Sequence, residues 1–271
     1  MANSLHYCSS GRADGPCLVL LHALGATHDL WWPQLAALEA DFRVVNVDLP
    51  GHGRSPMPQL GASMTDLAGE VAALIRDVAA AGAHVSGIST GGMIAQTLAI
   101  EHPCLVHSLA LCNTTSVVPQ VPPAEAAPAL FVSGQLVIGA ASRARSVGMK
   151  GIAPLAIERW FRPAFRNRDP ISVSRVEQMT LTNQPEGYAR VCEAISRFDV
   201  IERLSEIRVP TLVITGSHDP GTPLAWAREI VSGIPAAELV IIEDAAHVTN
   251  VERPQEFTSA LTEFLHSRAI S

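Results

Sequence analysis

A serine stands in a pattern that suits nucleophilic catalysis. Ser89 is the centre of the pentapeptide Gly-Ile-Ser-Thr-Gly at 87–91, which follows a short apolar run and precedes a stretch with helical spacing at 92–99. The pattern G-x-S-x-G between a strand and a helix is typical of a nucleophile elbow, a tight turn that presents a serine hydroxyl at the end of a sheet. The small residues Gly87 and Gly91 allow the following helix to come close. A hydroxyl is a weak nucleophile, so this chemistry also needs a base and donors for an oxyanion.

An acid and a histidine follow in the chain order that such a serine requires. Asp219 lies in the loop after the apolar run 211–215, and His247 lies in the loop after the apolar run 238–242. The carboxyl ends of parallel strands meet at one edge of a sheet, so we expect all three side chains at the same rim. We predict that His247 takes the proton of Ser89 and returns it to the leaving group. Asp219 is expected to orient and stabilise the imidazole.

Other residues offer the same chemistry from less suitable places. Asp199 and Asp244 are alternative acids, and His218 is an alternative base. Asp199 borders a helix-like segment, and Asp244 is too close in sequence to His247 to come from a strand end of its own. His218 shares the loop of the predicted acid, so we place each alternative second. The structural alternative for Asp219 itself is a turn aspartate that caps the next helix.

The oxyanion is expected to be held by two backbone N–H groups. One is that of Thr90, immediately after the serine, and the other is that of Leu24 in the loop His-Ala-Leu-Gly at 22–25. His22 and His52 are predicted to brace these loops by hydrogen bonds rather than to carry protons.

Apolar runs alternate with helical patterns along the chain, which predicts an α/β fold with a mostly parallel sheet and helices on both faces. The expected strands lie at 5–9, 17–21, 43–48, in the run before Ser89, and at 105–113, 211–215 and 238–242. The expected helices outside the middle of the chain lie at 30–40, 65–81, after Ser89, and at 224–232 and 254–267.

The character of the chain changes at about residue 117. Prolines accumulate there, and helix-like stretches without a convincing strand continue to 198. We predict that 117–198 is a helical cap inserted after the sixth strand, over the ligand-binding edge of the sheet, and that 1–116 and 199–271 form the core.

Composition excludes several classes of protein. Hydrophobic residues make up 48% and charged residues 17%, and the net charge is −7, so a large core is expected and nucleic-acid binding is not. The five cysteines are scattered, no secretory leader is recognisable, and no apolar run is long enough to span a bilayer. We therefore expect a cytoplasmic protein with reduced thiols and no membrane partner.

Several motifs together resemble one family. Over nearly its whole length the chain resembles the α/β hydrolases, and more narrowly the 3-oxoadipate enol-lactonases. The stretches that carry the resemblance are 20–25, Trp31, 51–55, 87–93, 158–161, 187–189, 192–195 and 246–252. The resemblance implies a small enol-lactone substrate with a carboxylate tail, whose hydrolysis yields 3-oxoadipate in aromatic-acid breakdown.

The sequence departs from these enol-lactonases in the cap and in the elbow. They usually carry a tryptophan and an arginine upstream of the pair Gly148-Met149, whereas the basic residues of this chain are shifted within 139–145. Thr90 also stands where methionine is common. Both differences lie in the expected pocket. They therefore affect which substrate the pocket accepts and not the expectation that the protein is a hydrolase.

The cap is rich in basic residues. Between 140 and 168 there are seven, and Glu158 is the only acidic residue. Arginine binds a carboxylate through two parallel hydrogen bonds, so we expect Arg143, Arg145 or Arg159 to face the pocket. Trp160 is a further candidate for its lining.

The predicted function is the opening of a small anionic enol-lactone through an acyl-enzyme, with no metal ion and no organic cofactor. Three alternatives stay open: a carboxylesterase or lactonase for another small acyl substrate, a carbon–carbon bond hydrolase of ring-cleavage products, and a ligand-binding receptor on the same scaffold. Nothing in the sequence indicates an oligomeric state.

Overall fold

The computed structural model describes residues 5–121 and 132–269. They form a seven-stranded sheet in the order β1-β3-β2-β4-β5-β6-β7. β1 is antiparallel to β3, and all other neighbours are parallel. The strands are β1 Tyr7–Gly11, β2 Cys17–Leu21, β3 Arg43–Val47, β4 Ala83–Ile88, β5 Val106–Cys112, β6 Thr211–Gly216 and β7 Ala237–Ile242. The mostly parallel sheet predicted from the sequence is confirmed.

Strand burial follows position in the sheet. Every residue of β2, β4 and β6 is buried, whereas the edge strands β1 and β7 are largely exposed or half-buried. Parallel strands are covered on both faces by helices, which explains the continuous apolar runs in the central strands.

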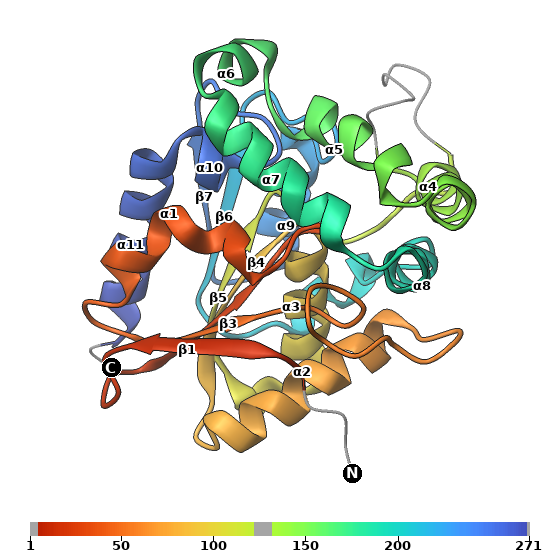
Figure 1. The fold of residues 1–271 in the computed structure, drawn as a ribbon. Coiled ribbons are helices and arrows are strands. Elements are labelled where there is room, and N and C mark those ends of the chain that lie inside the picture. Colours follow the sequence, from red (N-terminus) through yellow and green to blue (C-terminus); the bar gives the residue numbers. More distant parts are fainter. Residues whose placement is uncertain (1–4, 122–131, 270–271) are drawn as a thin grey trace.

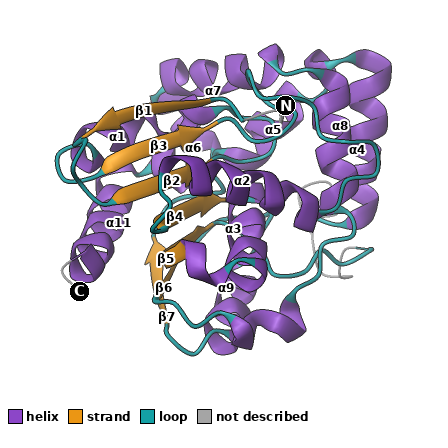
Figure 2. Cartoon of the chain, turned by 90° about the horizontal axis from the view of Figure 1, so that it is seen from below, coloured by secondary structure: helices purple, strands orange, loops and turns teal. Residues whose placement is uncertain are grey.

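Helices cover both faces of the sheet (Figures 1 and 2). In β2, Leu18 and Leu20 belong to a core shared with α1 and α11, and Val19 and Leu21 belong to a core shared with α2, α3 and α9. This alternation is the two-residue period of a strand. The helices are α1 Trp32–Leu38, α2 Met64–Val78, α3 Thr90–Glu101, α9 Leu224–Gly233 and α11 Pro254–Ala269, with short turns at η1 His28–Trp31, η2 Pro103–Leu105, η4 Ile201–Glu206 and α10 Thr249–Glu252.

A group of helices between β5 and β6 lies along one edge of the core (Figure 1). Val117 and Asp199 form an isolated antiparallel bridge where the chain leaves the core and returns to it. The described part of this insertion contains no strand, in agreement with the sequence pattern. Its helices are α4 Gly134–Val147, η3 Met149–Gly151, α5 Ala153–Trp160, α6 Pro163–Arg168, α7 Pro170–Thr182 and α8 Pro185–Ile195.

Two details differ from expectation. The insertion follows the fifth strand of the described chain, not the sixth, and the five strands expected before residue 117 are all present. The helix expected at 30–40 is split into η1 and α1, since the α-helix begins only at Trp32, with Pro33 in its first turn. None of the helices in the described ranges is long and apolar enough to cross a bilayer.

One contact between the insertion and the core is formed by a pair of glycines, one from each. Gly187 in α8 lies against Gly51, which has φ of +74° in the loop after β3, and a Cβ on Gly187 would overlap the carbonyl oxygen of Gly51. Close backbone contact of this kind is available only to glycine. The pair therefore sets how closely α8 can lie on the core.

Replacement of Gly187 by alanine should weaken this contact. We expect Gly187→Ala to lower the free energy of unfolding by about 1–3 kcal/mol, because the added methyl overpacks the contact. Urea unfolding measures the change. Gly69→Ala is the control, since nothing lies within 4 Å of a Cβ at Gly69 in α2. It should raise the stability by roughly 0.5–1 kcal/mol. Equal stability of the two variants would contradict the contact described.

Candidate active site

Ser89 occupies the turn between β4 and α3 in an unusual backbone conformation. Its φ is +55° and its ψ is −113°, a region that non-glycine residues rarely adopt. Glycines at 87 and 91 permit the turn, because a Cβ on Gly87 would overlap Gly91 and a Cβ on Gly91 would overlap the Leu21 carbonyl group. The Ser89 amide donates to the carbonyl group of Cys112, at 2.8 Å, and so links this turn to β5.

The structure brings Ser89, His247 and Asp219 together. Nε2 of His247 lies 2.9 Å from Oγ of Ser89, and Nδ1 of the same ring lies 2.8 Å from Oδ2 of Asp219. All three side chains are buried, with residue exposures of 7% or less. With Nδ1–H donated to the carboxylate, Nε2 is left to accept the proton of the hydroxyl.

The carboxylate of Asp219 is fully hydrogen-bonded. Oδ1 accepts from the amides of Gly221 and Thr222, and Oδ2 accepts from the hydroxyl of Thr222 and the side-chain amide of Asn113. Burial acts to raise the pKa of Asp219, but the charge of His247 and the hydrogen bonds outweigh it and lower that pKa. Asp219 therefore stays ionised beside the imidazole.

Asn113 is a site residue that the sequence argument missed. It follows β5 with φ of +45° and donates from Nδ2 to Asp219 at 2.9 Å and to the carbonyl group of Ala246 at 3.2 Å. Its Oδ1 accepts from the hydroxyl of Thr249 at 2.6 Å. Asn113 thus connects the loop of the acid to the loop of the histidine. A polar residue directly after an apolar strand was the available signal.

The cap also contacts the histidine loop. The carbonyl group of Trp160, at the end of α5, accepts from the amides of His247 and Val248 at 3.2 and 3.3 Å. Glu252 accepts from the amide of Ala246 at 2.8 Å. The position of the imidazole therefore depends on both the cap and the core.

Leu24 and Thr90 are among the residues that line the small cavity next to Ser89 and His247. Within the described ranges, neither amide donates a hydrogen bond to the protein. An oxyanion requires two such free N–H groups, so both residues stay candidates for holding it.

Two buried histidines brace the loops around these amides. Nε2 of His22 accepts from the amide of Leu49, and Nε2 of His52 accepts from the amide of Gly25, both at 2.9 Å. Burial lowers the pKa of His22 to about 3 and that of His52 to about 4, so both rings are neutral near pH 7. Both act as hydrogen-bonding braces, as the sequence suggested.

The rest of the cavity is mostly apolar and is formed largely by the cap. Arg159 and Trp160 reach it from α5. Nε of Arg159 is buried and has no hydrogen-bond partner in the described structure. The other lining residues are Met93, Val132, Val137 and Ile195.

The other two cap arginines lie elsewhere. Arg145 is on the surface, where its guanidinium contacts Glu186 at 2.8 Å and Glu193 at 2.6 Å. Arg143 is exposed on the same helix. Of the three arginines proposed from the sequence, only Arg159 reaches the described cavity.

The alternative acids and base are not part of this contact chain. Asp244 forms ion pairs with Arg162 and Arg253, and Asp199 lies at the neck of the insertion. His218 is exposed and contacts Ser217.

This fold, with a serine on a strained strand-to-helix turn beside a histidine and an acid, defines a hydrolase scaffold. The chain belongs to the α/β hydrolase family, whose model matches residues 18–260. It is more particularly similar to 3-oxoadipate enol-lactonase 2 of Acinetobacter baylyi, with 33% identity over 258 residues that cover 95% of this chain and 91% of the relative.

Solved structures agree with this assignment. The enol-lactonase from Burkholderia xenovorans LB400 superposes with a TM-score of 0.88 at 34% identity and covers 97% of this chain and 96% of that chain. A malate-bound thermophilic esterase from Thermogutta terrifontis has a TM-score of 0.87 at 27% identity, with coverage of 98% and 94%. The predicted fold class and family are confirmed, and the chain is a hydrolase.

Asn113 should affect catalysis through Asp219. We expect Asn113→Ala to lower kcat about tenfold, because a hydrogen bond to a charged group contributes about 1.5–3 kcal/mol and its loss frees the carboxylate to move. Hydrolysis of p-nitrophenyl acetate at a temperature far below the unfolding midpoint measures this. An unchanged kcat would show that Asn113 does not position the acid.

Proposed function

We propose that this protein is a serine hydrolase that opens a small enol-lactone carrying a carboxylate, of the 3-oxoadipate enol-lactone type, in aromatic-acid catabolism. The observation that carries the proposal is the contact chain Ser89–His247–Asp219 beneath a small cavity that Arg159 lines. The similarity to two enol-lactonases over almost the whole chain supports the same substrate class.

In the proposed reaction Ser89 attacks the carbonyl carbon of the lactone while Nε2 of His247 accepts the hydroxyl proton. Asp219 holds the ring in the tautomer that makes this possible and stabilises the imidazolium that forms. The negative oxygen of the tetrahedral intermediate accepts from the free amides of Leu24 and Thr90.

The ring then opens as the bond between the acyl carbon and the ring oxygen breaks. The leaving enolate stays attached through the carbon chain and takes the proton from His247, on oxygen or on carbon, which leaves the imidazole neutral again. A water molecule, deprotonated by His247, attacks the acyl-enzyme and releases the carboxylic acid and free Ser89. The steps need no redox partner, because the overall change is the addition of water.

Arg159 is the proposed partner of the substrate carboxylate. It lines the cavity, and its buried Nε lacks an acceptor, which is costly for a polar group unless a ligand supplies one. Arg145 is already paired with two glutamates, and Arg143 is exposed. A carboxylate in the cavity satisfies Arg159 and fixes which end of the lactone meets Ser89.

A carboxylesterase for another small acyl substrate is the second candidate. It is favoured by the similarity to the malate-bound esterase, and by the mostly apolar lining around Ser89. Both candidates use the same three side chains, so comparison of an enol-lactone with simple anionic esters separates them.

The proposed nucleophile gives the first test. Ser89→Ala should lower kcat on 3-oxoadipate enol-lactone by roughly 10⁴-fold or more, because removal of the nucleophile disables the whole relay. His247→Gln should have a loss of similar size. His218→Gln is the matched control on the neighbouring loop and should keep wild-type activity. Substantial turnover by Ser89→Ala would refute the covalent mechanism.

The proposed carboxylate partner gives the second test. Arg159→Met should lower kcat/KM on an anionic lactone or ester by about 10- to 100-fold, which corresponds to the loss of a hydrogen bond to a charged group. Activity on the neutral methyl ester should change little. Arg143→Met is the control for the loss of one positive charge from the cap. An equal loss on the anionic and neutral substrates would contradict this role.

A further inference from the structure

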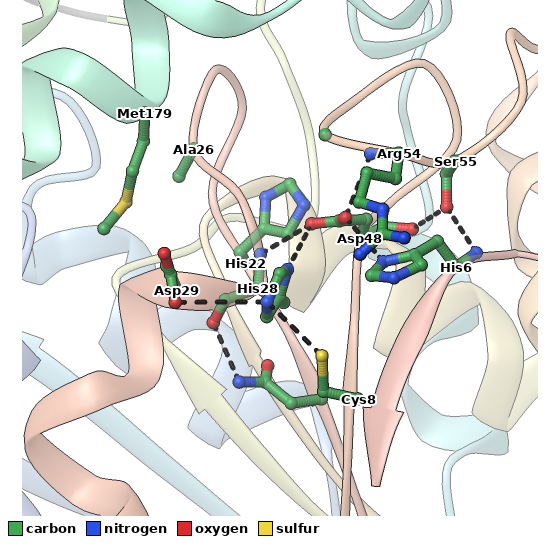
Figure 3. Close-up of polar contacts among 12 residues, drawn as sticks. His6, Cys8, His22, Ala26, His28, Asp29, Asp48, Arg54, Ser55 and Met179 are labelled. Carbon is green, nitrogen blue, oxygen red and sulfur yellow. Dashed lines mark hydrogen bonds and ion pairs between the residues drawn. The ribbon is translucent and has the colours of Figure 1, made fainter.

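Three donors of a kind that bind metal ions meet at the edge of the sheet, outside the cavity at Ser89. His6 lies just before β1, His28 begins η1, and Asp48 follows β3. Nδ1 of His6 lies 2.9 Å from Oδ2 of Asp48, and Nδ1 of His28 lies 2.9 Å from Oδ1. Figure 3 shows the carboxylate between the two imidazoles.

The carboxylate is held firmly in place. The side chain of Asp48 is 1% exposed, and the amides of His28 and Arg54 donate to its two oxygens at 2.8 and 3.0 Å. The hydroxyl of Ser55 donates to the Asp48 carbonyl group and accepts from the amide of His6. The carboxylate is therefore oriented before any ion binds.

The two imidazoles have a different exposure from the carboxylate. Their side chains are 19% and 22% exposed, so solvent reaches one edge of the cluster while the carboxylate stays inside. The neighbouring charges are those of Asp29, whose Oδ1 lies 3.9 Å from Nε2 of His28, and Arg54. A thiol, that of Cys8, lies 3.5 Å from the same Nε2.

We infer that His6, His28 and Asp48 form a binding site for a divalent transition-metal ion of the zinc class. One donor atom from each residue lies within 4.8 Å of the other two. Zinc binds imidazole nitrogen and carboxylate oxygen at about 2.0–2.2 Å in a tetrahedron, so the donors of one ion lie about 3.3–3.6 Å apart. The widest pair therefore has to close by at most about 1.5 Å when the ion binds, and water completes the coordination.

Among the described residues, a histidine pair on β4 and β5 lacks the carboxylate that this cluster contains. The rings of His84 and His107 lie 5.7 Å apart, but the partner of His84 is the hydroxyl of Ser108, and no carboxylate joins them in the described structure. Two imidazoles alone form a weaker donor set than two imidazoles with a fixed anion.

Metal binding here is a structural property and takes no part in the chemistry at Ser89. An ion on these three residues links the start of β1, the start of η1 and the end of β3. His28 follows the loop of Leu24, and its carbonyl group also accepts from Asn46 at 2.8 Å. Binding should therefore stabilise the native state by mass action.

Zinc titration of the metal-free protein tests the inference. We expect calorimetry with zinc chloride to give one saturable site, and zinc to raise the unfolding temperature in a way that EDTA reverses. The double variant Cys8→Ser and Cys104→Ser is used throughout, because exposed thiols bind zinc themselves. In that background His6→Ala should weaken binding about tenfold or more.

Controls separate the ligand set from other causes. His6→Gln keeps a polar group beside Asp48. If this variant has a normal unfolding temperature without zinc but no longer binds zinc, the loss of binding is due to the missing imidazole and not to a damaged fold. His107→Ala should bind like its parent. Binding unchanged in both His6 variants, or the absence of saturable binding in the parent, overturns the site. Loss of zinc binding in the single variant Cys8→Ser would place the ion between Cys8 and Nε2 of His28 instead. That result overturns the proposed ligand set of His6, His28 and Asp48.

Discussion

The buried carboxylate of Asp219 constrains the whole carboxyl edge of the sheet. A charge with no access to solvent is stable only when hydrogen bonds and an opposite charge replace its hydration. Here the replacement comes from Thr222, Asn113 and His247, which lie after β6, β5 and β7. Loops that are distant in sequence are thereby held in one arrangement, and the imidazole between the carboxylate and Ser89 takes a defined orientation.

The helical insertion between β5 and β6 also contributes to this site. The carbonyl group of Trp160 accepts from the His247 amide, so the same helix end that lines the cavity also supports the histidine loop. Arg159 precedes it and brings a guanidinium whose Nε lacks an acceptor. The guanidinium that lines the cavity and the carbonyl group that contacts the histidine loop therefore belong to adjacent residues of α5.

Backbone proximity imposes a second constraint on the core. The elbow requires Gly87 and Gly91, because β4, α3 and β2 approach too closely there for side chains. Ser89 itself takes a strained conformation and directs its hydroxyl toward His247 at the carboxyl edge of the sheet. Strain at one residue is tolerated because the surrounding packing over-determines the turn.

The sequence by itself determined the parallel sheet, the elbow and the loops that carry Ser89, Asp219 and His247. Those features follow from short-range patterns: apolar runs, turn residues, and the rule that parallel strands end at one edge. The helix expected at 30–40 is instead split into η1 and α1, because the first turn of a helix has a weak pattern.

Only the tertiary structure decided which cap arginine lines the cavity, that Asn113 joins two loops, and that His6, His28 and Asp48 meet. The arginines lie within one basic stretch, so their spacing alone did not separate them. Rotation and packing of α4 and α5 turn Arg145 toward two glutamates and Arg159 toward the cavity. Side chains far apart along the chain acquire their partners only when the helices and the sheet pack together. A short sequence pattern does not show which distant residues come into contact.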